Sequence, residues 1–169
     1  MGQDGLGRLF NIVPGIVPVD LRNATTAGKR VSLKNAGGVT FVFFGAAGTA
    51  ADDPTVDIQE HDAATGGTSQ DLDVVTYYHK IQETTLDGDE VWTKVTQSAA
   101  SEVVGDGTSA EEQKIFVIEV DASQLSDGFE YVSAAVTVAN AGAQLGCLLY
   151  IVRDLHIAAA PASLAQPQS

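Results

Sequence analysis

The stretch Leu145-Gly-Cys-Leu-Leu-Tyr-Ile-Val152 decides the fold of this chain, because it predicts a β-strand that is apolar on both faces. Side chains alternate across a strand. One face carries Leu145, Cys147, Leu149 and Ile151, and the other carries Leu148, Tyr150 and Val152. A sandwich leaves one face of each sheet in water, so this strand needs a second cover. That cover is either another segment of the same chain or another subunit.

Two more strands are predicted just before this one, at residues 115–120 and 131–138. The segment between them, residues 121–128, is rich in turn-forming side chains and ends in a glycine. The last two strands are separated only by residues 140–144, a loop of the length that a β-hairpin uses. Residues 114–154 therefore predict consecutive, mutually paired strands.

The rest of the chain carries shorter strand patterns separated by turn residues. Residues 29–34 alternate cleanly and residues 39–44 are β-branched or aromatic, so the two predict a hairpin. Further strands are predicted at residues 55–60, 73–85 and 90–97, the last two joined at Asp87-Gly88. About eight or nine short strands and no long helix indicate an all-β, single-domain antiparallel β-sandwich, of jelly-roll or immunoglobulin-like type.

The ends of the chain differ from its middle, which we assign as a sandwich domain at residues 22–157. Residues 1–21 are an N-terminal arm or edge segment, since Pro14 and Pro18 cannot donate to a sheet ladder. This segment packs either on a neighbouring molecule or on its own sandwich. Residues 158–169 contain two prolines and no charge, which predicts an extended tail that is ordered only where a partner holds it.

The charge is strongly acidic, with 22 Asp and Glu against 9 Lys and Arg and a formal net charge of -13. Nucleic-acid binding needs a clustered basic surface, which is absent, so no nucleic-acid partner is expected. No apolar run approaches the ~20 residues of a membrane helix, and the first residues do not resemble a signal peptide. We therefore expect a protein made in a cytoplasm, without a membrane partner.

No pattern in the sequence predicts an enzyme, a metal site or a cofactor. The histidines, His61, His79 and His156, are isolated from one another, and Cys147 is best interpreted as a small buried hydrophobe. Asp87-Gly-Asp-Glu90 lacks the spacing of a calcium loop, and no serine lies in a nucleophile-elbow pattern. Trp92, Tyr77 and Tyr78 could form an aromatic platform for sugars, but such residues more often lie in a core or in cross-strand pairs.

Several segments together resemble small structural proteins of tailed bacteriophages, similar to the capsid decoration or minor capsid proteins of actinobacterial phages. The resemblance lies in Leu6-Gly-Arg-Leu-Phe10, Pro18-Val-Asp-Leu21, Gly28-Lys-Arg-Val-Ser-Leu-Lys-Asn35, Gly48-Thr-Ala-Ala-Asp-Asp-Pro54, Thr84-Thr-Leu-Asp-Gly-Asp-Glu-Val-Trp-Thr-Lys-Val-Thr96, Leu125-Ser-Asp-Gly-Phe129 and Ala143-Gln-Leu-Gly-Cys-Leu-Leu-Tyr150. It implies a β-rich, non-enzymatic protein that is made in the host cytoplasm and then bound to the outside of the assembled head. The implied partners are the major capsid protein and further copies of the chain in a homotrimer.

The capsid decoration proteins act through a binding surface and not through a catalytic site. The resemblance therefore assigns no catalytic residue to this chain. We predict that the capsid or subunit interface includes apolar residues of the arm and of the last strand, namely Phe10, Ile12, Val13, Ile16, Val17, Leu148, Tyr150 and Val152. Two other hypotheses remain open at this stage. One is a carbohydrate-binding or adhesin-like sandwich that uses Trp92, and the other is a tail or head-to-tail joining protein.

Overall fold

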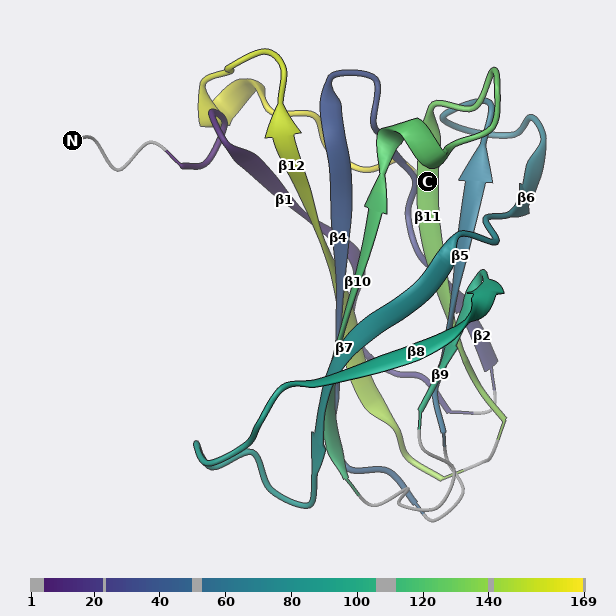
Figure 1. The fold of residues 1–169 in the computed structure, drawn as a ribbon, viewed down its shortest axis with the longest axis vertical. Helices are drawn as coiled ribbons and strands as arrows, with labels where there is room; N and C mark the ends of the chain where they lie inside the picture. Colours follow the sequence, from purple (N-terminus) through teal and green to yellow (C-terminus); the bar gives the residue numbers. More distant parts are fainter. Residues whose placement is uncertain (1–4, 23, 50–52, 106–111, 140–141, 169) are drawn as a thin grey trace.

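The computed structural model describes residues 5–22, 24–49, 53–105, 112–139 and 142–168, which form two antiparallel sheets of six strands each. The sheets pack face to face around one hydrophobic core (Figure 1). The predicted all-β antiparallel sandwich is therefore confirmed. Residues 1–4 of the predicted arm and residue 169 of the predicted tail lie outside the described residues.

Sheet A contains the long strands. Its spatial order is β1 (Phe10–Asp20), β12 (Leu145–Leu155), β4 (Ala36–Gly45), β10 (Gln113–Asp121), β7 (Val75–Glu83) and β8 (Thr93–Ala100). The predicted strand at residues 73–85 is β7, and its predicted antiparallel pairing with the next strand is confirmed. The tight turn predicted at Asp87-Gly88 is wrong, because all of residues 84–92 connect β7 and β8.

Sheet B contains mostly short strands. Its main order is β2 (Ala24–Ala27), β11 (Tyr131–Val138), β5 (Thr55–His61) and β6 (Ser69–Asp71); β3 (Val31–Ser32) also pairs with β11, and β9 (Glu102–Val104) with β5. The helical segments in the described residues are the 3-10 turns η1 (Ala122–Gln124) and η2 (Pro161–Ser163). Neither is long enough to span a membrane.

Two predicted hairpins are wrong, because consecutive strands cross between the sheets. β10 and β12 lie in sheet A on either side of β4, whereas β11, which lies between them in the sequence, belongs to sheet B. In the same way β3 and β4 lie in different sheets. Packed sheets are only about 10 Å apart, so a loop short enough for a hairpin can also join strands across the core.

Tyr150 connects the two sheets through contacts in the core. Its ring packs edge-on against Phe41 at 4.9 Å between centroids, and its side chain is completely buried. The phenol reaches β11, where the Ala134 N–H donates to Oη at 3.0 Å. A Cβ atom on Gly15 would lie 2.3 Å from the ring, so the absence of a side chain there gives Tyr150 its space.

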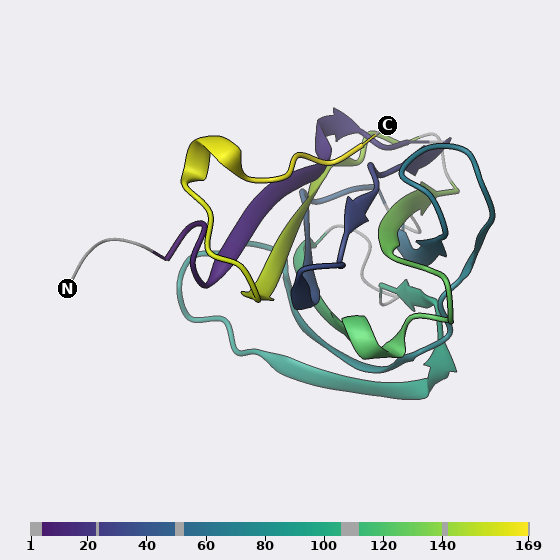
Figure 2. The same cartoon turned by 90° about the horizontal axis from the view of Figure 1, so that it is seen from above.

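The described parts of both terminal segments fold onto the sandwich itself. Val13 and Ile16 are buried in the core and β1 pairs with β12, so residues 10–20 are part of the sandwich, which begins before residue 22. The C-terminal segment also lies on its own chain: the backbones of Arg30 and Gln168 exchange hydrogen bonds of 2.8 and 2.7 Å. Figure 2 shows this segment passing over β1. The described part of the tail thus makes backbone hydrogen bonds within its own chain.

Candidate docking surface

The residues predicted as an interface fall into two groups in the structure. Those buried in the core of the same chain are Val13, Ile16, Leu148, Tyr150 and Val152. Ile12 and Val17 are exposed, and Phe10 is half-buried. The prediction therefore has to be corrected for the five buried residues, which offer no surface to a partner in the folded chain. The sandwich covers the face of β12 that carries Leu148, Tyr150 and Val152, and it leaves the opposite face of this strand uncovered.

The uncovered face of sheet A is apolar across four adjacent strands. Residues that lie directly opposite in an antiparallel pair share a face of the sheet. Pro14 of β1 lies opposite Leu149 of β12, Leu149 opposite Val42 of β4, and Val42 opposite Val117 of β10. These four side chains form one continuous row across the sheet.

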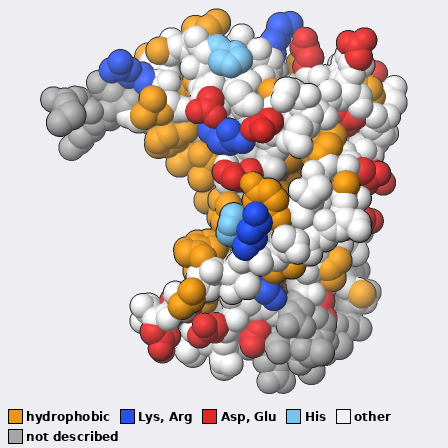
Figure 3. Space-filling model, in the orientation of Figure 1, with side chains coloured by type: hydrophobic (Ala, Val, Ile, Leu, Met, Phe, Trp, Pro, Cys, Tyr) orange, Lys and Arg blue, Asp and Glu red, His pale blue; other side chains and the backbone are white. Residues whose placement is uncertain are grey.

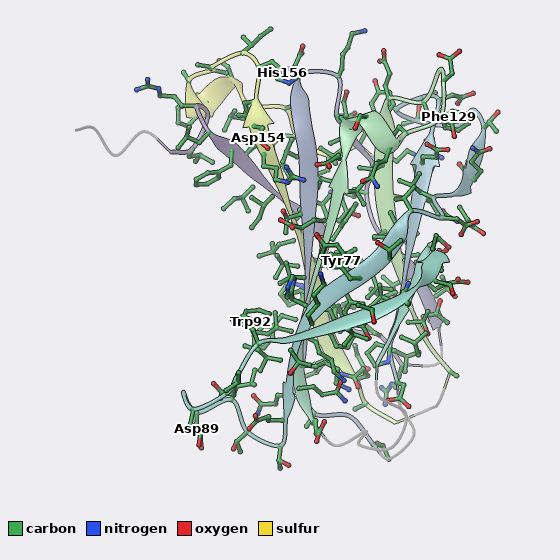
Figure 4. All side chains as sticks on the ribbon, viewed as in Figure 1. Tyr77, Asp89, Trp92, Phe129, Asp154 and His156 are labelled. Carbon is green, nitrogen blue, oxygen red and sulfur yellow. The ribbon has the colours of Figure 1, made fainter. Side chains whose placement is uncertain are left out.

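A second apolar row runs parallel to the first. Cys147 lies opposite Phe44, Phe44 opposite Ile115, and Ile115 opposite Ile81 of β7. Burial raises the pKa of the Cys147 thiol, which therefore stays protonated near neutral pH and contributes as an apolar group. Trp92 directly precedes Thr93, which lies opposite Lys80, the neighbour of Ile81. Trp92 is 52% exposed (Figure 4).

The two rows, with their flanking residues, form what we call the outward apolar face of sheet A. Its most exposed large side chains are Ile12, Val19, Phe44, Tyr77, Trp92, Leu145 and Leu149. With roughly 200 Å² for each full side chain, their exposed fractions leave about 650 Å² of apolar surface in water. The largest apolar patch of a typical monomer is about 300–600 Å², so this face has the size of an interaction surface.

The face is also concave. Figure 3 shows apolar side chains gathered in a hollow between two lobes that carry charged groups. Within the face lies a depression of about 470 Å³, lined by Pro18, Val19, Phe44, Ala46, Gln113, Leu145, Gly146 and Cys147. Gln113 brings the only polar side chain to this lining apart from the Cys147 thiol. A site with so few hydrogen-bonding groups suits an apolar protein surface better than a sugar.

Charged groups lie beside the face. Arg153 forms ion pairs with Asp121 at 2.5 Å and with Asp154 at 2.8 Å. At the β7–β8 edge of the same face, the Lys94 ammonium group lies 3.8 Å from the centre of the Tyr77 ring. An apolar centre with a charged, solvated rim is the usual arrangement of a protein-protein contact.

The aromatic platform predicted for sugars is not formed. Tyr78 is only 4% exposed and points into the core, whereas Tyr77, its neighbour in the strand, points outward. Lys94 lies over one side of the Tyr77 ring, and Trp92 is the most exposed of the three aromatic side chains.

His61 looks at first like part of a catalytic group, since its ring lies between two serine hydroxyls. Nδ1 is 2.8 Å from Ser69 Oγ, and Nε2 is 2.8 Å from Ser133 Oγ. Arg30 donates to the same Ser69 oxygen, which favours a Ser69 hydroxyl that donates to Nδ1. Burial, with the nearby Arg30 charge, lowers the pKa of His61 to about 4. A buried, neutral ring without a bonded carboxylate is a structural link between strands and lacks the geometry of a general base.

Glu60 is a buried carboxylate that anchors the segment after β10. Ser126 donates to it through its backbone N–H at 2.8 Å and its hydroxyl at 2.5 Å, and Gln70 Nε2 donates at 2.6 Å. These contacts satisfy the charge with three donors.

We expect the substitution Glu60→Gln to lower the free energy of unfolding by about 2 kcal/mol, because the new amide group would turn a donor toward Ser126 or Gln70. Urea titration measures this value. The matched control is Glu83→Gln, the same exchange at an exposed position at the end of β7, which is expected to change the free energy by less than about 0.5 kcal/mol. Equal effects of the two exchanges would show that the Ser126 contacts contribute little.

Among the described residues, one group of acids lies close enough to hold a cation: Asp87, Asp89 and Glu90 in the β7–β8 loop. Glu90 accepts a hydrogen bond of 3.0 Å from the Gly88 N–H, so the turn itself already uses this carboxylate. Figure 4 shows Asp89 at the exposed tip of the loop. The cluster is therefore explained by the turn. His61, His79 and His156 belong to different parts of the fold and form no such group.

The contribution of β4 and β10 to this surface was not predicted from the sequence. Phe41-Val-Phe-Phe44 and Ile115-Phe-Val-Ile118 are apolar at every position, the same signal that singled out β12. Three adjacent strands with apolar residues on both faces indicate a sheet that is covered on one side by its own sandwich and exposes an apolar surface on the other.

No model of a known protein family matches the chain, and no curated protein is similar to it.

Proposed function

We propose that this chain is a non-enzymatic structural protein of a phage virion, which docks on the outer surface of the capsid and stabilises the shell. Its partners are the major capsid protein and, in a homotrimer, further copies of the chain. The observation that carries the proposal is the outward apolar face of sheet A, which is larger than a monomer needs to expose. The resemblance in sequence supplies the identity of the partner.

The acidic net charge of the chain supports a location on the exterior of the capsid. A net charge of -13 favours solubility in the surrounding water and disfavours contact with packaged nucleic acid. Because a shell presents many equivalent sites, each docking contact can be modest and the occupied lattice is still stabilised.

The test is binding to purified heads that lack the protein, measured by co-sedimentation. We expect the double variant Phe44→Thr and Leu149→Thr to bind about a hundredfold more weakly than the native chain, since each substitution removes an apolar side chain from the contact. Threonine is a good strand former, so the fold is expected to survive. Thermal unfolding of the isolated variant verifies this.

The control is Val104→Thr, because Val104 is 51% exposed but lies on β9 in sheet B. It should bind heads like the native chain. Native-like binding by the Phe44 and Leu149 double variant would rule out this face as the docking surface. Absence of binding by the native chain would rule out the proposed function itself.

A further inference from the structure

We propose that the free edge of β8 pairs with β8 of a second copy of this chain, in an antiparallel, two-fold contact that extends sheet A across both molecules. This goes beyond the proposed function and does not depend on it, because the contact uses the edge of the sheet and not its outward apolar face. A strand at the edge of a sheet presents unpaired N–H and C=O groups, which are a template for a further strand.

Every other edge of the sandwich is protected in a recognisable way. β1, at the opposite edge of sheet A, contains Pro14 and Pro18 and two irregularities in its pairing with β12. The edges of sheet B consist of short strands: β2 with four residues, β3 with two, and β6 and β9 with three each. Short strands, prolines and bulges are the devices by which proteins prevent edge-to-edge pairing.

β8 lacks most of these devices. It has eight residues, Thr-Lys-Val-Thr-Gln-Ser-Ala-Ala, without proline or glycine, and its register with β7 is regular from Thr93 to Thr96. Its one irregularity lies between Thr96 and Ala100. Figures 1 and 2 show β8 as the outermost strand at the front of the molecule. Within the part of the chain that the structure describes, β7 is the only strand that pairs with it.

Lys94, the one charged residue of β8, does not prevent another strand from pairing with its free edge. Lysine on an edge strand usually discourages pairing, because an approaching strand would have to bury or displace the charge. Here the Lys94 ammonium group is turned back onto the Tyr77 ring of the neighbouring strand, 3.8 Å from its centre. The cation-π contact holds the charge over the outward face of the sheet, away from the free edge.

A second copy fits this edge better than a chain of different composition for two reasons. β8 is itself a good edge partner, since Thr93, Val95 and Thr96 are strand-forming residues. Two copies that each carry a net charge of -13 repel each other, so they can approach closely only where acids are absent, and β8 contains none.

Symmetry adds a third reason. Residues opposite each other in an antiparallel pair point to the same side of the sheet. A two-fold axis that lies between the two β8 strands therefore places the outward apolar faces of both copies on the same side of the extended sheet, next to each other. The paired molecules would offer one continuous docking surface, and homotrimers joined in this way would form hexamers.

Sedimentation velocity of the full chain over a concentration series tests the proposal. We expect the native chain to form dimers, or hexamers if trimers also form, and to associate more strongly at high salt, which screens the repulsion. The variant Thr96→Lys adds a cation near the middle of β8, so that the two copies bring like charges together at the two-fold axis. It is expected to weaken the two-fold step by about tenfold or more, because like charges opposite each other repel.

Two controls separate this contact from a loss of fold. Ala24→Lys adds the same charge to β2, another edge strand, and should leave the association unchanged. An equimolar mixture of Thr96→Lys and Thr96→Glu should restore the even-numbered species, because opposite charges then meet across the axis. A native chain that stays monomeric or only trimeric, or a Thr96→Lys variant with native association, would overturn the proposal.

Covalent capture gives a second readout. A cysteine at position 96, introduced as Thr96→Cys in a Cys147→Ser background, should form an intermolecular disulfide under mild oxidation. Ala24→Cys in the same background should not. Equal cross-linking at both positions would mean random collision and would also count against pairing at β8.

Discussion

The substitution Tyr150→Ala is expected to lower the free energy of unfolding by about 4 kcal/mol, the largest single effect that we predict for this fold. The side chain is completely buried between the sheets and packs against Phe41. Its removal leaves a cavity and also leaves the Ala134 N–H without the phenol oxygen that accepts its hydrogen bond. Denaturant titration followed by fluorescence or circular dichroism measures the change.

Tyr150→Phe separates the two parts of this effect. It keeps the ring and removes only the hydroxyl, so a loss of about 1–2 kcal/mol is expected from the unsatisfied Ala134 N–H. Burial raises the pKa of the Tyr150 phenol, which therefore stays a neutral donor and acceptor over the whole range in which the protein is handled. A Tyr150→Phe variant as unstable as Tyr150→Ala would show that packing contributes little.

Gly15 provides an independent check on the same contact. A Cβ atom at this position would lie 2.3 Å from the Tyr150 ring, so Gly15→Ala should destabilise the native chain by about 1–3 kcal/mol. In the Tyr150→Ala background the clash is gone and the cost should largely vanish. The double-mutant cycle thus predicts a coupling of similar size, and strictly additive effects would contradict the role of Gly15 as the space for Tyr150.

The second large effect is a loss of stability in acid that originates at His61. Its pKa is about 4 in the folded chain, chiefly because of burial, against about 6.5 in the unfolded chain. Between these two values the unfolded state binds a proton and the folded state does not. The folded state is therefore penalised as the pH falls from about 6.5 to 4, by a total of about 3 kcal/mol.

The measurement is the free energy of unfolding at a series of pH values for the native chain and for His61→Gln. The variant keeps a polar group between Ser69 and Ser133 but cannot titrate, so its stability should fall less steeply in acid. His156→Gln is the matched control, because His156 is exposed, and it should follow the native profile. Parallel profiles for the native chain and His61→Gln would show that His61 does not carry the acid sensitivity.

Much of the fold was predictable from local patterns. Alternation at residues 29–34 and 55–60 and the scarcity of helical periodicity indicated an all-β sandwich, and β10, β11 and β12 were found close to their observed bounds. These features depend on side-chain period, which acts over a few residues.

The pairing of strands and the choice of face were not predictable in the same way. The double-faced apolar strand at residues 145–152 indicated a surface beyond the core, but nothing in its own sequence distinguished Leu148, Tyr150 and Val152, which are buried, from Leu149 and Leu145, which are exposed. The outcome depends on where distant residues such as Gly15 and Ala134 make room for Tyr150 and meet its hydroxyl.

The sequence by itself thus determined most of the longer strands, the sandwich class and the presence of an excess apolar face on this protein, but not the short strands β2, β6 and β9. The tertiary structure decided which face is covered, which hairpins exist and which edge stays free. The physical reason is that periodicity is a local property of the chain, whereas burial is a property of the contacts between strands far apart in sequence, such as β1, β4 and β12.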